Sequence, residues 1–153
     1  MRADDISVLE TAEDQETFIC LMDFLTEYTG SKCRYWYPLC ALKKEVPVVA
    51  YDVDRIYKED KIGQIEKVIS ACKIAQCVSF QMQYGNMKRR NENLLELLYE
   101  RDKDGYTFPW YVETFYFDDN REWMIYVSHE GTITFTGEMI TKEALKWMEG
   151  KPL

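Results

Sequence analysis

Residues 106–137 constrain the fold of this chain more than any other stretch. They form three runs rich in aromatic and β-branched side chains, separated by polar segments at 118–121 and 129–131. The last run, residues 132–136, alternates strictly, with Ile133 and Phe135 on one side and three threonines on the other. Such alternation is typical of a β-strand with one buried face. The stretch therefore predicts a three-stranded antiparallel meander.

The loop between the second and third runs decides which residues face each other. A three-residue loop at 129–131 pairs Val127 with Ile133, and it leaves Gly131 to adopt the left-handed conformation that such a loop needs. A two-residue loop would pair Val127 with Thr134 and mix apolar with polar side chains. We therefore expect the three-residue loop.

The turn at residues 118–121 is expected to place Phe117 beside Trp123 and Phe115 beside Ile125. The odd-numbered side chains then form the predicted core face: Phe115, Phe117, Trp123, Ile125, Val127, Ile133 and Phe135. The even-numbered side chains form a polar face rich in aromatic surface: Thr114, Tyr116, Met124, Tyr126, Thr132, Thr134 and Thr136.

The rest of the chain alternates between helical and extended patterns. Helices are predicted at residues 11–29, within 52–75, at 91–101 and at 141–149, and strands at 46–51 and 76–84. Pro47 indicates an edge position or a strand start for residues 46–51. These two strands and the helix between them could form a right-handed parallel crossover. In the last helix, Thr141 is expected at the N-terminal cap, with Leu145 and Met148 facing inward.

These elements predict an α+β fold of two layers, with about four helices. The sheet is expected to be mixed and about five-stranded, with the antiparallel meander at its C-terminal end. A length of 153 residues favours a single domain over residues 1–153.

Composition and cysteine content favour a cytoplasmic protein. Hydrophobic residues make up 46% of the chain, which suffices for a core, and no run approaches the roughly 20 apolar residues of a membrane-spanning helix. The acidic N-terminus is not followed by the apolar core of a secretory signal. The odd number of cysteines indicates reduced, mostly buried thiols. Their spacing and the single histidine give no support for a metal site, and no cofactor is expected.

The charge is distributed very unevenly. The formal net charge is −8, and residues 1–30 hold eight acids against one arginine, a net −7. The remaining 123 residues hold 19 acids and 18 bases, a net −1. Nucleic-acid binding is disfavoured because neutralising phosphates requires clustered Lys and Arg. The distribution favours a basic protein partner instead.

An acidic row follows the predicted first helix at Glu13, Glu16, Asp23 and Glu27. It lies roughly opposite an apolar stripe that includes Phe18. The row is either a solvated helix face or the surface that meets the basic partner. A basic triplet at residues 88–90 precedes the helix predicted at 91–101, where positive charge is mildly unfavourable. It is either solvated, functional in itself, or close to an acidic neighbour.

Common catalytic and phosphate-binding signatures do not occur in the sequence. The best catalytic candidate is an acid–base pair formed by His129 and Glu113, which the expected register brings to one end of the meander. An enzyme or small-ligand-binding protein built around this pair and Tyr111 is the alternative function. In the less specific interpretation, His129 shapes the turn and Glu113 reaches water. Cys20 is a poor nucleophile because neighbouring carboxylates raise a thiol pKa.

The features together favour a non-enzymatic binding module that covers a basic partner. Its expected contact residues are the acidic row and, on the even-numbered face, Tyr116 and Tyr126. In size, charge and expected compartment the chain is similar to the small cytosolic immunity proteins that neutralise bacterial toxins. The similarity implies a bacterial inhibitor of a basic protein, and the sequence does not indicate an oligomeric state.

Overall fold

A computed structural model describes residues 6–8, 47–59, 61–81, 87–99, 114–118, 122–128, 131–150 and 152. Its strands are β1 (Ile6–Val8), β2 (Val48–Asp52), β3 (Gln76–Gln81), β4 (Met87–Asn93), β5 (Thr114–Phe117), β6 (Met124–Val127) and β7 (Thr132–Thr136). Its helices are α2 (Val53–Lys58), α3 (Ile62–Ala71), α4 (Leu94–Tyr99) and α5 (Glu138–Trp147). The mixture of sheet and helices confirms the α+β class.

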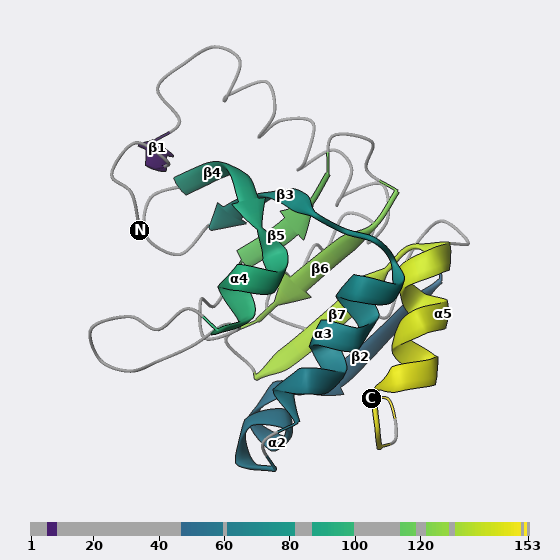
Figure 1. The fold of residues 1–153 in the computed structure, drawn as a ribbon. Helices are drawn as coiled ribbons and strands as arrows, with labels where there is room; N and C mark the ends of the chain where they lie inside the picture. The colour runs from purple at the N-terminus through teal and green to yellow at the C-terminus, as the bar shows by residue number, and fades with distance from the viewer. Residues whose placement is uncertain are drawn as a thin grey trace, which may run out of the picture.

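The strands form one sheet in the order β1-β4-β3-β5-β6-β7-β2 (Figure 1). All the pairings between described strands are antiparallel, so the expectation of a mixed sheet is wrong for this part of the chain. All five expected strands are present, and β1 and β4 are additional. β2 lies at one edge of the sheet, as Pro47 at its start indicated.

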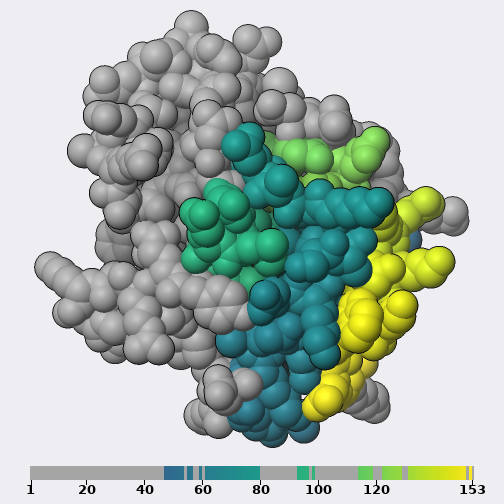
Figure 2. Space-filling model, in the orientation of Figure 1, coloured from purple at the N-terminus to yellow at the C-terminus, as the bar shows by residue number. Residues whose placement is uncertain are grey.

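The described helices pack on one face of the sheet (Figure 1), and α3 and α5 lie side by side (Figure 2). Apolar side chains spaced along each helix make this possible. α3 buries Ile65, Val68 and Ile69, as the sequence predicted. The sheet side of the core includes Val49, Tyr51, Tyr116, Ile125, Val127, Ile133 and Phe135.

The hairpin of β6 and β7 has the predicted register. Val127 pairs with Ile133, and Ile125 with Phe135. Gly131 has a φ of 75°, so it adopts the left-handed conformation expected for it. The hydroxyls of Ser128 and Thr132 close the hairpin at 2.6 Å. The local sequence was sufficient to predict this register because the residues of the turn and the alternation of the side chains favour the same pairing.

The register between β5 and β6 differs from the prediction by one residue. Phe117 pairs with Met124 rather than Trp123, and Phe115 pairs with Tyr126 rather than Ile125. The shift moves Phe115 and Phe117 to the sheet face away from the helices, with the even-numbered residues of β6 and β7. Tyr116 and Thr114 move in the opposite direction, to the helix-covered face. Trp123 is still buried in the core, and its Nε1 donates a 3.0 Å hydrogen bond to Asp118 across the connection.

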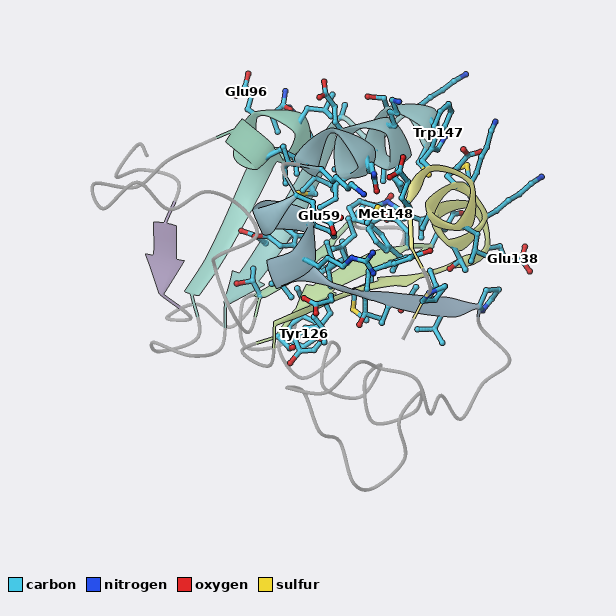
Figure 3. All side chains as sticks on the ribbon, turned by 90° about the horizontal axis from the view of Figure 1, so that it is seen from below. Glu59, Glu96, Tyr126, Glu138, Trp147 and Met148 are labelled. Atoms are coloured by element: carbon cyan, nitrogen blue, oxygen red, sulfur yellow. The ribbon has the colours of Figure 1, made fainter. Side chains whose placement is uncertain are left out.

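We call the sheet face away from the described helices the far face. It contains Thr132, Thr134 and Thr136 from β7, Met124 and Tyr126 from β6, Phe115 and Phe117 from β5, and Ala50 from β2. The expected polar, accessible surface is not found, because every one of these side chains is at most 7% exposed. Phe115 and Tyr126 stack with ring centroids 4.5 Å apart. Figure 3 shows Tyr126 on this face and Met148 on the helix side.

Three of the four expected helices are present as α3, α4 and α5, and the one expected at 11–29 lies outside the described residues. α5 begins three residues earlier than predicted, and its buried side is formed by Ile140, Thr141 and Ala144. Leu145 is 58% exposed instead of buried, whereas Met148 is buried as expected. Thr141 lies within the helix rather than at its cap, and its hydroxyl donates to the Pro47 carbonyl at 3.2 Å.

Gly137 explains the early start of α5. Its φ is 124°, and a Cβ at this position would lie 2.4 Å from the carbonyl oxygen of Glu122. The chain can therefore leave β7 and enter the helix directly only with a glycine here.

The strands β2 and β3 run in the same direction, but β5, β6 and β7 lie between them. The expected crossover thus spans several strands instead of joining neighbours. The basic triplet 88–90 lies within β4 and not immediately before the helix. Its strand pairs with β1, which belongs to the acidic first thirty residues.

Candidate functional site

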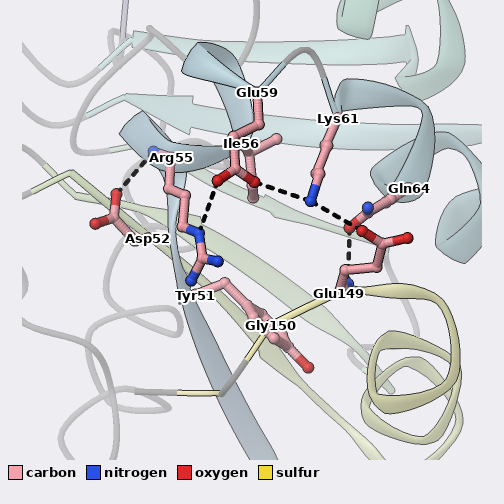
Figure 4. A pocket seen from close by; sticks show the side chains of 9 residues that line it. All are labelled: Tyr51, Asp52, Arg55, Ile56, Glu59, Lys61, Gln64, Glu149 and Gly150. Carbon is pink, nitrogen blue, oxygen red and sulfur yellow. Dashed lines mark hydrogen bonds and ion pairs between the residues drawn. The ribbon is translucent and has the colours of Figure 1, made fainter.

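The structure contains a hollow between α2 and the end of α5, with a volume of about 150 Å³ (Figure 4). Segments far apart in the sequence line it: Tyr51, Asp52, Arg55, Ile56, Glu59, Lys61, Gln64, Glu149 and Gly150. Five of these nine residues are acidic or basic (Asp52, Arg55, Glu59, Lys61 and Glu149). We therefore consider this hollow as a candidate site.

Helix α2 brings the first charged residues to this hollow. Its start is capped by Asp52, whose Oδ1 accepts a 3.0 Å hydrogen bond from the Arg55 backbone amide. The Val53 amide donates to the Gly131 carbonyl at 2.8 Å, which ties the helix to the β6–β7 hairpin. One helical turn separates Arg55 from Glu59, and their side chains form an ion pair at 3.2 Å.

Lys61 joins the two sides of the hollow. Its Nζ lies 2.9 Å from Glu59 Oε2 and 2.9 Å from Glu149 Oε2. The Glu149 amide also donates a 2.8 Å hydrogen bond to Gln64 Oε1. These contacts attach the segment after α5 to the segment between α2 and α3.

The ion pairs shift the titration of the three groups. Hydrogen bonds first from Lys61 and then from Arg55 lower the pKa of Glu59. Lys61 likewise lowers the pKa of Glu149, and hydrogen bonds to Glu149 and then Glu59 raise the pKa of Lys61. The charged forms are favoured throughout, so none of the three is tuned to exchange protons near neutral pH.

Tyr51 lines the inner wall of the hollow. Its hydroxyl donates to the Ala144 carbonyl at 3.5 Å, and burial raises the pKa of this phenol. Its ring meets Phe135 edge-on with centroids 6.3 Å apart. Tyr51 therefore connects the hollow to the core and remains protonated at neutral pH.

The ion pairs connect α2, the start of α3 and the segment after α5. The nine lining residues include no serine, threonine, cysteine or histidine, so this hollow does not contain the common pairing of a hydroxyl or thiol nucleophile with a histidine. Glu59 and Glu149 form ion pairs with Arg55 and Lys61, while Asp52 accepts from the Arg55 backbone amide, as the dashed contacts in Figure 4 show. The sequence analysis singled out none of these residues. The spacing of four between Arg55 and Glu59 is a local signal that could have indicated their ion pair, whereas Lys61 and Glu149 are too far apart in the chain for any such signal.

The residues singled out from the sequence are elsewhere. Glu13, Glu16, Asp23, Glu27, Glu113, Tyr111, Cys20 and His129 lie outside the described residues. Tyr116 and Tyr126 are described, and both are buried, at 2% and 0% exposure. They lie on opposite faces of the sheet, because Tyr116 pairs with Ile125 and Tyr126 with Phe115. In this structure neither ring is available to a partner.

The two described cysteines, Cys72 and Cys77, are buried and form no disulfide. Burial and then the nearby charge of Glu143 raise the pKa of Cys72 to about 11, so its thiol is un-ionised and unreactive near neutral pH. Within the described ranges, no cluster of His, Cys, Asp and Glu side chains could hold a metal ion.

Helices α2 to α5 include no segment that is long and apolar enough to cross a membrane. No protein-family model matches the chain, and no match is found among curated proteins or solved structures. The function must therefore be inferred from the physical features of the molecule.

Proposed function

We propose that this protein is a non-enzymatic binding module that covers a basic protein partner, as an inhibitor or an immunity-type protein would. The contact surface is the acidic face of the helix predicted at residues 11–29, formed by Glu13, Glu16, Asp23 and Glu27. The observation that carries the proposal is the charge distribution, with a net −7 in the first thirty residues against −1 in the other 123. The two buried tyrosines, Tyr116 and Tyr126, are not part of the proposed surface.

Two features of the described residues support this assignment. Four of the five charged groups around the hollow form ion pairs with one another, so the hollow has little uncompensated charge to attract a ligand. Both faces of the central sheet are buried, which removes the meander as a binding platform. The concentrated negative charge of the N-terminal segment remains as the strongest long-range feature of the chain.

Such a segment acts mainly through the rate of association. Complementary charge steers two proteins together and raises the association rate, and added salt screens the effect. We place the complex in the cytoplasm, since reduced cysteines such as Cys72 and Cys77, which form no disulfide, are typical of that compartment.

The test begins with identification of the protein that co-purifies with the full chain. The triple substitution Glu16→Gln, Asp23→Asn and Glu27→Gln should then weaken binding roughly ten-fold, since three charge contacts of about 0.5 kcal/mol each add up to that factor. Most of the loss should appear in the association rate and should shrink as salt rises.

The matched control neutralises three exposed acids in the described part of the chain: Glu96, Glu122 and Glu138. This variant has the same net charge as the test variant, so equal weakening by both would show that only overall charge matters. Unchanged binding by the first triple would exclude the acidic row as the contact surface.

A further inference from the structure

The strand β4 has an outer edge that is only partly covered. On one side it pairs with β3, and on the other with β1. The β1 pairing covers three positions, with Ile6 opposite Arg89 and Val8 opposite Met87. No described strand pairs with this edge of β4 from Arg90 to Asn93. An open strand edge presents backbone donors and acceptors to any extended segment that reaches it.

The strand β4 is basic, whereas the sequence on either side of β1 is acidic. β4 carries three consecutive bases at residues 88–90, and two of these positions are register partners of β1. In the sequence, Asp4 and Asp5 come directly before β1, and Glu10 follows two residues after it. Residues 1–10 hold three acids against one arginine, so a peptide of this sequence has the charge opposite to that of the triplet.

We propose that the outer edge of β4 is a docking site for an extended acidic peptide, and that residues 6–8 of this chain occupy it as an internal ligand. Backbone hydrogen bonds to the strand edge would provide affinity, as in other cases of strand addition. The basic triplet would select acidic sequences over neutral ones.

Residues 6–8 are expected to be held weakly, because they pair with β4 over only three positions at the end of the sheet. A pairing of three residues at the end of a sheet opens more readily than the interior strands. A tethered segment nevertheless competes at an effective concentration on the order of millimolar, which a free peptide cannot match at micromolar concentration. The site must therefore be vacated before binding of a free peptide can be measured. The inference concerns β4 and goes beyond the proposed role of the acidic helix.

The experiment uses the full chain with Ile6→Pro and Ser7→Pro. Successive amides of a strand point to opposite sides, so this pair removes a donor facing β4 whichever residue supplies it. The probe is a fluorescent peptide with the sequence of residues 1–10. A matched control peptide carries Asp4→Asn, Asp5→Asn and Glu10→Gln.

The acidic peptide should bind the double-proline variant at least ten-fold more tightly than the unmodified protein. It should slow hydrogen exchange of the amides of residues 87–93, and the neutral peptide should bind several-fold more weakly. Equal binding to both proteins, or no protection of residues 87–93, would overturn the docking site. Equal binding of the two peptides would overturn its preference for acidic sequences.

A second measurement does not depend on the proline variant. Lys88→Glu with Arg89→Glu, in the otherwise unmodified chain, should accelerate exchange of the amides of residues 6–8 while β7 exchanges as before. Unchanged exchange at residues 6–8 would show that charge does not hold the internal ligand, and that result contradicts the proposal. Protection of β7 also reports whether either variant has lost its fold.

Discussion

Two regions place their polar groups in opposite environments. In the charged corner, formed by the ion pairs of Arg55, Glu59, Lys61 and Glu149 around the hollow, the polar groups are exposed, whereas in the threonine row of β7 (Thr132, Thr134 and Thr136) they are buried. At the corner, Lys61 makes two ion pairs, yet its partners are 39% and 67% exposed. In the row, Thr134 and Thr136 are 0% and 3% exposed, and their hydroxyls have no hydrogen-bond partner among the described residues. Water competes for the exposed contacts and cannot reach the buried hydroxyls. Burial, rather than the number of polar contacts, should therefore decide where a substitution matters.

The largest effect is expected at the end of the threonine row, where β7 passes into α5. Gly137→Ala would place a Cβ 2.4 Å from the Glu122 carbonyl oxygen at a φ of 124°, so about 3 kcal/mol of stability should be lost. Gly63→Ala is the control, because nothing lies within 4 Å of its Cβ position inside α3. That substitution should gain about 0.5–1 kcal/mol. Denaturant unfolding measures both, and a similar change at the two glycines would contradict the close approach at Gly137.

The threonine row itself should give effects of opposite sign. Thr134→Val and Thr136→Val each remove a buried hydroxyl that has no partner in the described part of the chain, so each should stabilise the protein by about 1 kcal/mol. Thr132→Val removes the hydroxyl that lies 2.6 Å from Ser128 and should cost about 1 kcal/mol. Thermal unfolding of the three variants tests the contrast. Destabilisation by all three would mean that the first two hydroxyls do have partners.

The smallest effect is expected at the charged corner, despite its larger number of contacts. Lys61→Met should change stability less than any of the threonine substitutions, because the groups it joins are exposed. A double-mutant cycle with Glu149→Gln isolates the pair, and Glu138→Gln, at an exposed acid at the start of α5, serves as a control. A coupling free energy between Lys61 and Glu149 that exceeds the loss of stability caused by Thr132→Val would contradict the expectation that burial decides where a substitution matters.

The pH dependence at the corner follows from the pKa shifts. The pKa values of Glu59 and Glu149 are lowered on folding, so their contribution is present above the ordinary value of 4.5 and is lost as pH falls through the folded value. The pKa of Lys61 is raised, so its contribution is present below 10.5 and is lost as pH rises through the folded value. Between these limits the effect of Lys61→Met on stability should not depend on pH.

Several features could be predicted because they depend on neighbouring residues. The β6–β7 hairpin follows from Gly131 and the alternation of residues 132–136, and α3 follows from the spacing of its isoleucines. The register of β5 could not be predicted in this way. A strand buried on both faces has no polar side, so its alternation cannot reveal a shift of one residue. The start of α5 depended on the approach of Gly137 to Glu122, a contact between the residue that follows β7 and the segment that precedes β6.

The sequence by itself determined the α+β class, the last hairpin, the inward face of α3 and the concentration of acids in the first thirty residues. These are properties of composition, of turns and of periodic spacing within single elements. Only the tertiary structure decided the order of the sheet, the burial of both its faces, the Lys61–Glu149 contact and the pairing of β1 with β4. Each of these joins segments that have no local means of specifying one another, since their partners are chosen by the packing of the whole core.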